Sequence, residues 1–291
     1  LRAWIARLKE QGVDFMLNYE WRGWKEGALV FSTTGEDASV TPDATILALG
    51  GASWPRLGSD GGWVDVLKAQ NIEIALLRPA NCGFYVDWSP VFSARFAGTP
   101  LKAAALSFND QSVRGEFVMT DKGIEGSAVY ALGALLREEI ARSGSAQLII
   151  DLKPDLDANE IQKRLQRPRA GLSLTNYLRK TLKLPDVAIG LLMEKLDRTK
   201  LSAYTPAQLT RAIKFYALDL NGIFSIDRAI STAGGVTFDA IDDNAMLVNK
   251  EGVFIAGEML DWEAPTGGYL LQASLSSGVC AANGVMRWLN S

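Results

Sequence analysis

Two short segments near the C-terminus carry residue types suited to holding a ligand rich in hydroxyl and acidic groups. The first is an apolar run, 253–256, followed directly by Gly257 and Glu258, and the second, 266–271, contains a glycine pair. Glycine lets a ligand lie against the backbone, and a carboxylate accepts hydrogen bonds from hydroxyls. A helix that opens on two glycines presents unpaired N–H groups and a partial positive charge. This order favours a flavin site, and an ordinary strand–helix connection with a glycine turn is the alternative.

The complete absence of histidine restricts the chemistry further. With no histidine in 291 residues, Ser-His-Asp and Cys-His machinery and imidazole metal sites are excluded. Cys82 and Cys280 are far apart and lack a CxxC partner, so we expect no metal site and a reduced, cytoplasmic compartment. The chemistry must therefore come from a cofactor, or from carboxylates, lysines and tyrosines.

The total charge gives expectations about partners. A net charge of −3 provides no basic field for nucleic acid or an anionic membrane, and no apolar window reaches the length of a membrane span. We therefore expect neither partner, and a small-molecule substrate instead. The basic residues that gather between 163 and 183 form either a solvated face or a substrate-docking face; they are Lys163, Arg164, Arg167, Arg169, Arg179, Lys180 and Lys183.

Hydrophobic periodicity divides the chain into an α/β pattern. It predicts strands at 13–19, 28–32, 44–49, 84–86, 103–108, 115–119, 146–152, 223–230 and 253–256. It predicts helices at 1–12, 63–70, 128–142, 157–166, 172–182, 187–196, after a capping box at Thr205, and at 273–285. The first helix has no room for a cap, which suggests that the chain starts partway through a fold.

A second glycine pair lies at the end of a predicted strand. The strand 44–49 runs into Gly50 and Gly51, with Trp54 close behind. Such a break suits close ligand approach at a strand's carboxyl end, and a simple turn into the following helix explains it equally well.

Several of these motifs together resemble one flavoprotein family. In chain order they are Gly50-Gly51-Ala52-Ser53-Trp54-Pro55, Gly115-Glu116-Phe117 with Gly123-Ile124-Glu125-Gly126, Ala233-Gly234-Gly235-Val236, Ala256-Gly257-Glu258-Met259-Leu260-Asp261 and Pro265-Thr266-Gly267-Gly268-Tyr269. The chain is similar to the FAD-binding two-dinucleotide-binding-domain flavoproteins that include aminoacetone oxidase-like proteins and a bile-acid dehydroxylation reductase. The resemblance covers nearly the whole chain.

The resemblance implies a fold and a set of cofactor residues. It implies an α/β, Rossmann-like FAD-binding domain at 1–84 and 236–291, a β-barrel-like insert at 85–152 and 215–235, and a small helical insert at 153–214. It also implies non-covalent FAD and leaves NAD(P)H open as an electron donor. The residues expected at the cofactor are Gly50, Gly51, Gly257, Glu258, Thr266, Gly267, Gly268, Tyr269, Leu270 and Leu271, with Trp54 and Trp262 on the substrate side.

Departures from the family pattern indicate a divergent branch. They are Leu49 for a usual threonine, Trp54 for tyrosine, Asp121 for histidine, Ser127 for proline, Ala264 for glycine and Leu270 for asparagine. The largest departure is that no two glycines stand two residues apart, so the GxGxxG unit that holds the pyrophosphate is absent. We therefore expect a C-terminal fragment that lacks its N-terminal dinucleotide unit and binds FAD poorly alone.

Two functions of different classes follow. The first is a flavin-dependent oxidoreductase acting on an unidentified small molecule. The second is a non-catalytic, degenerate flavoprotein module that serves in protein interaction or flavin holding. No residue stands out as a general base.

Overall fold

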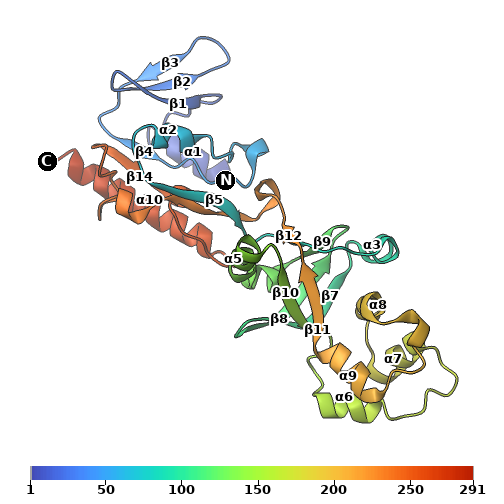
Figure 1. Cartoon of the computed structure of the whole chain (residues 1–291). Coiled ribbons are helices and arrows are strands. Elements are labelled where there is room, and N and C mark those ends of the chain that lie inside the picture. Colours follow the sequence, from blue (N-terminus) through green and yellow to red (C-terminus); the bar gives the residue numbers. More distant parts are fainter. Residues whose placement is uncertain (1, 291) are drawn as a thin grey trace.

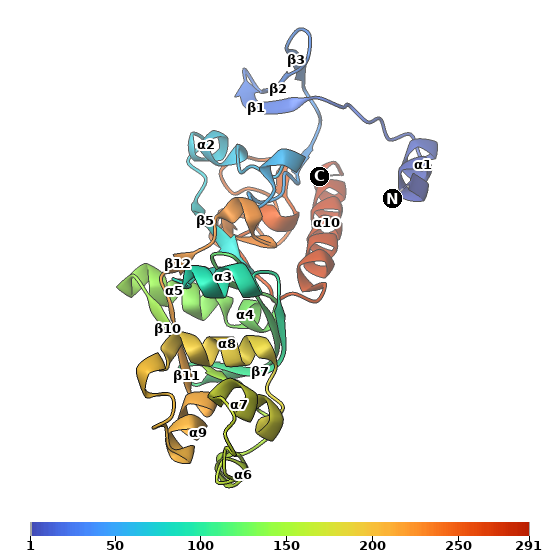
Figure 2. The ribbon, with the colours of Figure 1, turned by 90° about the vertical axis from the view of Figure 1, so that its right-hand side faces the viewer.

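The structure is a computed structural model, and it describes residues 2–290. Leu1, the start of the first predicted helix, lies outside these residues. The helix itself is α1 (Arg2–Glu10), and none of its residues is buried. Figure 2 shows α1 standing apart from the body of the molecule, joined to it by an extended stretch. The strand predicted at 13–19 is wrong: this stretch is exposed up to Asn18 and pairs with no strand of the described chain, and the amide of Val13 donates back to Leu8 O of α1 at 3.0 Å.

One end of the molecule contains the strands and helices that flank the predicted cofactor residues (Figure 1). An antiparallel sheet comprises β1 (Glu20–Lys25), β2 (Ala28–Ser32) and β3 (Ala38–Val40). Strand β4 (Thr45–Leu47) pairs in parallel with β14 (Val253–Ile255), and β5 (Ile74–Ala80) pairs antiparallel with β13 (Ser231–Val236). Helices α2 (Trp63–Lys68) and α10 (Tyr269–Trp288) complete this end.

The middle of the molecule is a sheet in which seven strands are described, in the order β11-β10-β7-β8-β9-β6-β12. Their bounds are β6 (Phe84–Tyr85), β7 (Pro100–Phe108), β8 (Gln111–Met119), β9 (Gly123–Glu125), β10 (Ala146–Asp151), β11 (Tyr216–Leu220) and β12 (Gly222–Ile223). Helices α3 (Pro90–Phe96), α4 (Ser127–Ala131) and α5 (Gly133–Ser143) accompany it. The sheet is open, because no hydrogen bonds join its end strands.

A group of short helices forms the far end (Figure 1). They are α6 (Ala158–Arg164), α7 (Leu174–Leu182), α8 (Asp186–Lys195) and α9 (Pro206–Lys214). The capping box predicted at Thr205 is present, with Thr205 and Gln208 satisfying each other's backbone N–H groups.

The remaining short elements are 3-10 turns: η1 (Pro55–Leu57), η2 (Arg198–Lys200), η3 (Ile226–Arg228), η4 (Phe238–Ala240) and η5 (Gly257–Met259). The η3 turn corrects the strand predicted at 223–230. Of the predicted strand, only Ile223 lies in an observed strand, β12, because the chain turns there toward β13.

Two main apolar cores hold the described residues together. One lies between β4, β14, α2 and the η5 turn, and includes Leu47, Leu67 and Ile255. The other extends from the open sheet into the short helices without a break, from Phe84 to Leu209. The α/β class is confirmed, while the division into three domains with the boundaries given above stays a prediction. No helix of the described chain is long and apolar enough to cross a membrane.

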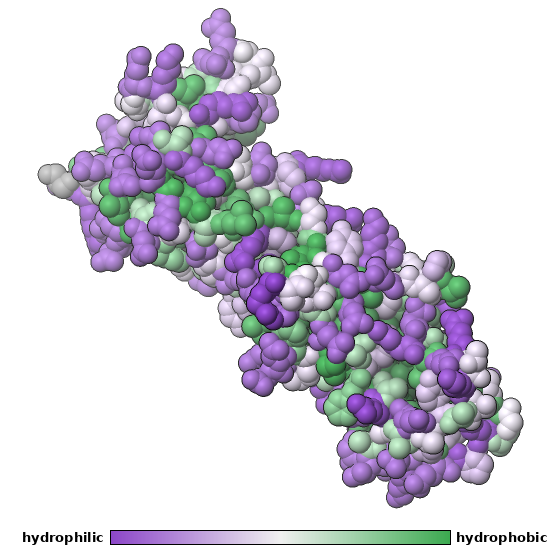
Figure 3. Space-filling view, viewed as in Figure 1, coloured by the Kyte–Doolittle hydropathy of each residue, from purple (hydrophilic) through white to green (hydrophobic). Residues whose placement is uncertain are grey.

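Helix α10 leaves one apolar stripe uncovered. Its other side buries Ala281 and Gly284 and packs Val285 and Trp288 partly against the core. The side chains on the stripe follow one another at helical spacing and are all exposed; they are Leu271, Leu275, Val279, Met286 and Leu289. Figure 3 shows a broad hydrophobic area over this end of the molecule. Contiguous apolar surface of this kind is typical of interaction sites.

We predict that the stripe lets two copies of the chain associate, and that Val279→Lys weakens this association about tenfold, since burial of a valine side chain contributes roughly 1.5–3 kcal/mol. Sedimentation velocity over a concentration series measures the effect. Ser276→Lys is the matched control, because it adds the same charge on an exposed position of α10 away from the stripe. Equal association constants for the two variants would contradict the expectation.

Candidate cofactor site

The parallel pairing of β4 with β14 brings the two predicted glycine segments to one edge. Thr45 lies opposite Val253 and Leu47 opposite Ile255, so both strands end at the same level. The amide of Ala256 donates to the carbonyl of Leu47 at 3.0 Å and closes the ladder. The chain then leaves β4 through Gly50 and β14 through Gly257, as the sequence predicts for the carboxyl edge of a nucleotide-binding sheet.

Gly51, Thr232 and Glu258 meet at this edge. The amide of Ala52 donates to Thr232 Oγ1 at 2.8 Å, and the amide of Thr232 donates to Glu258 Oε1 at 2.8 Å. A Cβ on Gly51 would lie 2.3 Å from Thr232 Oγ1 and 3.1 Å from the carboxyl carbon of Glu258. Only glycine fits this position. Glu258 is half-buried and keeps its second carboxylate oxygen without a protein partner among residues 2–290.

Backbone conformation keeps space open beside Gly50 and Gly257. Both have a positive φ, 75° and 79°, which a residue with a side chain rarely adopts. The indole N–H of the buried Trp63 donates to the carbonyl of Gly50 at 3.0 Å and holds that turn in place. No atom lies within 4 Å of a Cβ built on Gly257. A ligand can therefore approach the backbone there.

The start of α10 presents a row of free amides. Gly267 and Gly268 have φ of 126° and 91°, and α10 has no side-chain cap. The first helical hydrogen bond is from Gln272 N to Gly268 O, at 2.9 Å. In the described part of the chain, the amides from Thr266 to Leu271 have no acceptor, and the residues around them are exposed. These donors, together with the helix dipole, can bind a group that carries negative charge.

The loop that leads to these amides is fixed by residues from elsewhere. Asn81 Nδ2 donates to the carbonyl of Ala264 at 2.7 Å. Arg137, on α5, donates to both carboxylate oxygens of Glu263 at 2.9 and 2.7 Å. The loop is therefore held at Glu263 and Ala264, two residues before the first free amide.

The two tryptophans predicted on the substrate side differ in environment. Trp54 is 50% exposed and opens the η1 turn, where its side chain is free to contact a ligand. Trp262 is half-buried and packs against the core beneath η5. At the helix start, Tyr269 is 62% exposed, Leu271 is exposed and Leu270 is half-buried. These positions are compatible with ligand contact, and the roles of all the predicted site residues stay predictions.

Cys82 is close to this region but is poorly suited to nucleophilic chemistry. Burial raises the pKa of its thiol to about 11, although the Arg137 guanidinium opposes the shift. The thiol is therefore protonated at neutral pH. In residues 2–290 no group of acidic or cysteine side chains is placed to hold a metal ion, and the arrangement offers hydrogen bonding and shape.

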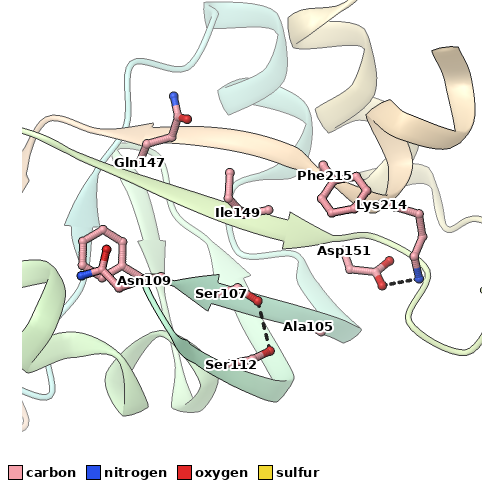
Figure 4. Close-up of a pocket in the computed structure, with 10 residues that line it drawn as sticks. Ala105, Ser107, Asn109, Ser112, Gln147, Ile149, Asp151, Lys214 and Phe215 are labelled. Carbon is pink, nitrogen blue, oxygen red and sulfur yellow. Dashed lines mark hydrogen bonds and ion pairs between the residues drawn. The ribbon is translucent and has the colours of Figure 1, made fainter. Parts of the chain in front are cut away.

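A separate hollow lies on the open sheet, away from these residues. It holds about 490 Å³ between β7, β8, β10 and the end of α9, and its floor carries Ser107, Ser112 and the Asp151–Lys214 ion pair of 2.5 Å (Figure 4). None of the predicted cofactor residues lines it. We therefore place the candidate site at the glycine edge, not in this hollow.

The sequence reasoning missed four residues that shape the site: Trp63, Asn81, Arg137 and Thr232. Thr232 directly precedes the motif Ala233-Gly234-Gly235-Val236, so that motif gave a signal for its position. Trp63, Asn81 and Arg137 act through contacts between segments distant in the chain, and no local pattern marks them.

We expect Gly51→Ala to destabilise the fold by about 1–3 kcal/mol, because the added methyl group overpacks against Thr232 and Glu258. Guanidinium chloride denaturation measures the change. Gly278→Ala, on α10 with open space around its Cβ, is the control and should be neutral or stabilising. If Gly51→Ala lowered the free energy of unfolding no more than Gly278→Ala does, the close packing at Gly51 would be relaxed in solution.

Comparison with known proteins identifies the family of this chain. A family model described as HI0933-like protein Rossmann domain matches residues 1–284. The chain is 25% identical over 284 residues to a 3-dehydro-bile acid delta(4,6)-reductase of Clostridium scindens, covering 94% of this chain and 69% of that protein. It is 24% identical over 247 residues to a ribosomal RNA dihydrouridine synthase of Haemophilus influenzae, covering 83% of this chain and 60% of that protein.

Among solved structures, a 3-ketosteroid delta1-dehydrogenase of Sterolibacterium denitrificans aligns with 96% of this chain and 61% of its own. The identity is 16% and the TM-score 0.40, too low to support detail. The family match, by contrast, covers almost the whole chain and includes both glycine segments. The chain belongs to the HI0933-like Rossmann-domain family of FAD-binding flavoproteins.

Proposed function

We propose that this protein is a flavin-dependent oxidoreductase that binds FAD non-covalently and acts on a carbon–carbon double bond conjugated with a carbonyl group in a small organic molecule. The observation that carries the proposal is the meeting of Gly51, Thr232 and Glu258 at the carboxyl edge of β4 and β14, where α10 is joined to the edge by the hydrogen bond from Gly257 N to Ser277 Oγ at 2.9 Å. When bound, FAD would supply the hydride transfer.

The residues of the site fit such a cofactor. Gly50, Gly51 and Gly257 leave the backbone accessible, and the unpartnered oxygen of Glu258 can accept a hydrogen bond from a ribityl hydroxyl. The amides that follow Thr266 can donate to the pyrimidine edge of the ring system. Fixed donors placed where negative charge develops stabilise it without reorganisation.

The activities for which the two relatives are named support this type of substrate. A delta(4,6)-reductase of a 3-dehydro bile acid saturates ring double bonds near a carbonyl group. A dihydrouridine synthase saturates the ring double bond of uridine, which also lies beside a carbonyl group. The shared feature is a ring alkene conjugated with a carbonyl, and we extend it to this protein with NAD(P)H as the electron donor. A cytoplasmic location, where Cys82 and Cys280 stay free thiols, belongs to the same proposal.

We expect Glu258→Gln to weaken FAD binding by about tenfold or more, because a hydrogen bond to a charged group contributes roughly 1.5–3 kcal/mol. Quenching of flavin fluorescence, in this chain and in one extended upstream, gives the dissociation constants. Glu251→Gln, an exposed carboxylate just before β14, is the control and should change nothing. If neither chain binds FAD, the proposal fails and the non-catalytic module is favoured.

A second candidate places the double bond in RNA, and the distribution of charge favours it. Residues 153–214 contain 13 Lys and Arg against six Asp and Glu, a net +7 on a chain whose total is −3. The total charge therefore conceals a basic end and an acidic end. Lys163 and Lys180 of this segment are exposed and form no ion pair within residues 2–290. No large hydrophobic side chain is exposed in this described segment, so phosphate contact suits it better than membrane insertion.

We expect the double variant Lys163→Ala/Lys180→Ala to weaken binding of an RNA hairpin and to lower the salt slope by nearly two, since each phosphate contact contributes about 0.9 to it. Fluorescence anisotropy at several salt concentrations measures both quantities. The control is Lys25→Ala/Lys68→Ala, which removes the same charge at the other end. Identical slopes for the two variants would leave the small-molecule substrate as the better proposal.

A further inference from the structure

Arg137 forms an ion pair between the inserted sheet and the cofactor loop, and its surroundings are unusual for a structural arginine. It lies on α5, and its side chain is only 3% exposed. Its guanidinium donates to both oxygens of Glu263, at 2.9 and 2.7 Å, and to the carbonyl of Pro79 at 3.0 Å. The planar guanidinium thereby fixes Glu263 in direction as well as distance.

A neighbouring ion pair ties the same two parts together. Glu138, the next residue of α5, accepts from Arg78 on β5 at 2.8 and 2.9 Å, and also from Arg137 at 3.1 Å. Both pairs join α5 to the end of the molecule that contains the cofactor edge. Glu138 and Arg78 are substantially exposed, so this second pair contributes less than the first.

Arg137 and Asn81 act on adjacent residues of one loop. Asn81 adopts a positive φ of 51° and donates to the carbonyl of Ala264, next to Glu263. Before this point, the amide of Asp261 donates to Val236 O at 2.8 Å. After it, the amides of Thr266, Gly267 and Gly268 have no acceptor in the described chain. Glu263 and Ala264 are thus the last fixed points before the free amides.

We infer that Arg137 is a positioning residue: through Glu263 it sets the direction in which the free amides at the start of α10 point, and it makes that direction depend on the placement of the inserted sheet. Burying an arginine is costly, and an apolar residue of similar size would often stabilise a core at least as well. A geometric role explains the ion pair better than a stabilising one. The claim that these amides bind a flavin rests on the proposed function, whereas the restraint that Arg137 places on the loop does not.

The test compares hydrogen exchange in the loop with exchange in the sheet, in the protein without FAD. In Arg137→Met we expect the amides of Asp261 and Trp262 to exchange at least tenfold faster, while those of β7 and β8 keep their rates. Glu263→Gln removes the pair from the loop side, where the side chain is 35% exposed and the fold is less at risk, and should give the same result. Arg142→Met, which breaks an exposed ion pair with Glu139 on the same helix, is the control.

Arg137→Lys separates geometry from charge. Lysine keeps the charge but cannot hold both carboxylate oxygens in one plane. We therefore expect the loop amides of Arg137→Lys to exchange as fast as those of Arg137→Met. Unchanged exchange in both Arg137→Met and Glu263→Gln, or a uniform rise that includes β7 and β8, would overturn the inference. A parallel FAD titration keeps the two questions distinct: if the unaltered protein fails to bind FAD while loop exchange responds as expected, the proposed function fails and the restraint stands.

Discussion

The parallel contact between β4 and β14 is the constraint on which the site depends. These strands are short and about 200 residues apart in the chain, yet their pairing brings Gly51 and Glu258 to one edge. Parallel strands share the direction in which they end, so the two glycine turns must leave the sheet side by side. Everything inserted between them, the open sheet and the helical end included, must fold without separating these strands.

Thr232 shows how closely the segments approach. Its hydroxyl accepts from the amide of Ala52, its own amide donates to Glu258, and its side chain occupies the space that a Cβ on Gly51 would need. Thr232 is completely buried. The return strand β13 thus links the exit of β4 to the exit of β14. Gly51 is required by a protein contact as well as by any ligand. For this reason the glycine spacing alone could not distinguish a ligand site from a simple turn.

Local patterns predicted the elements whose signal is self-contained. The run 253–256 and the helix after Gly268 were recognisable because apolar length and glycine punctuation suffice to define them. The apolar stretch 13–19 has the same local pattern, but the structure gives it no strand to pair with, so it stays extended and exposed. Strand formation depends on a partner, and single-sequence reasoning cannot supply one. For the same reason β1 and β3 were missed.

The net charge of the whole chain also predicts little without knowledge of the fold. A total of −3 argues against anionic partners only if the charges are mixed evenly, and here the segment 153–214 alone carries +7. The fold keeps that segment at the end of the molecule opposite α10, so its field is not neutralised by the acidic cofactor end (Figure 1). Arg137 belongs to neither group: buried between the two parts, it is matched by Glu263 and Glu138. Its charge aligns two parts of one chain, whereas the exposed charges are accessible to external partners.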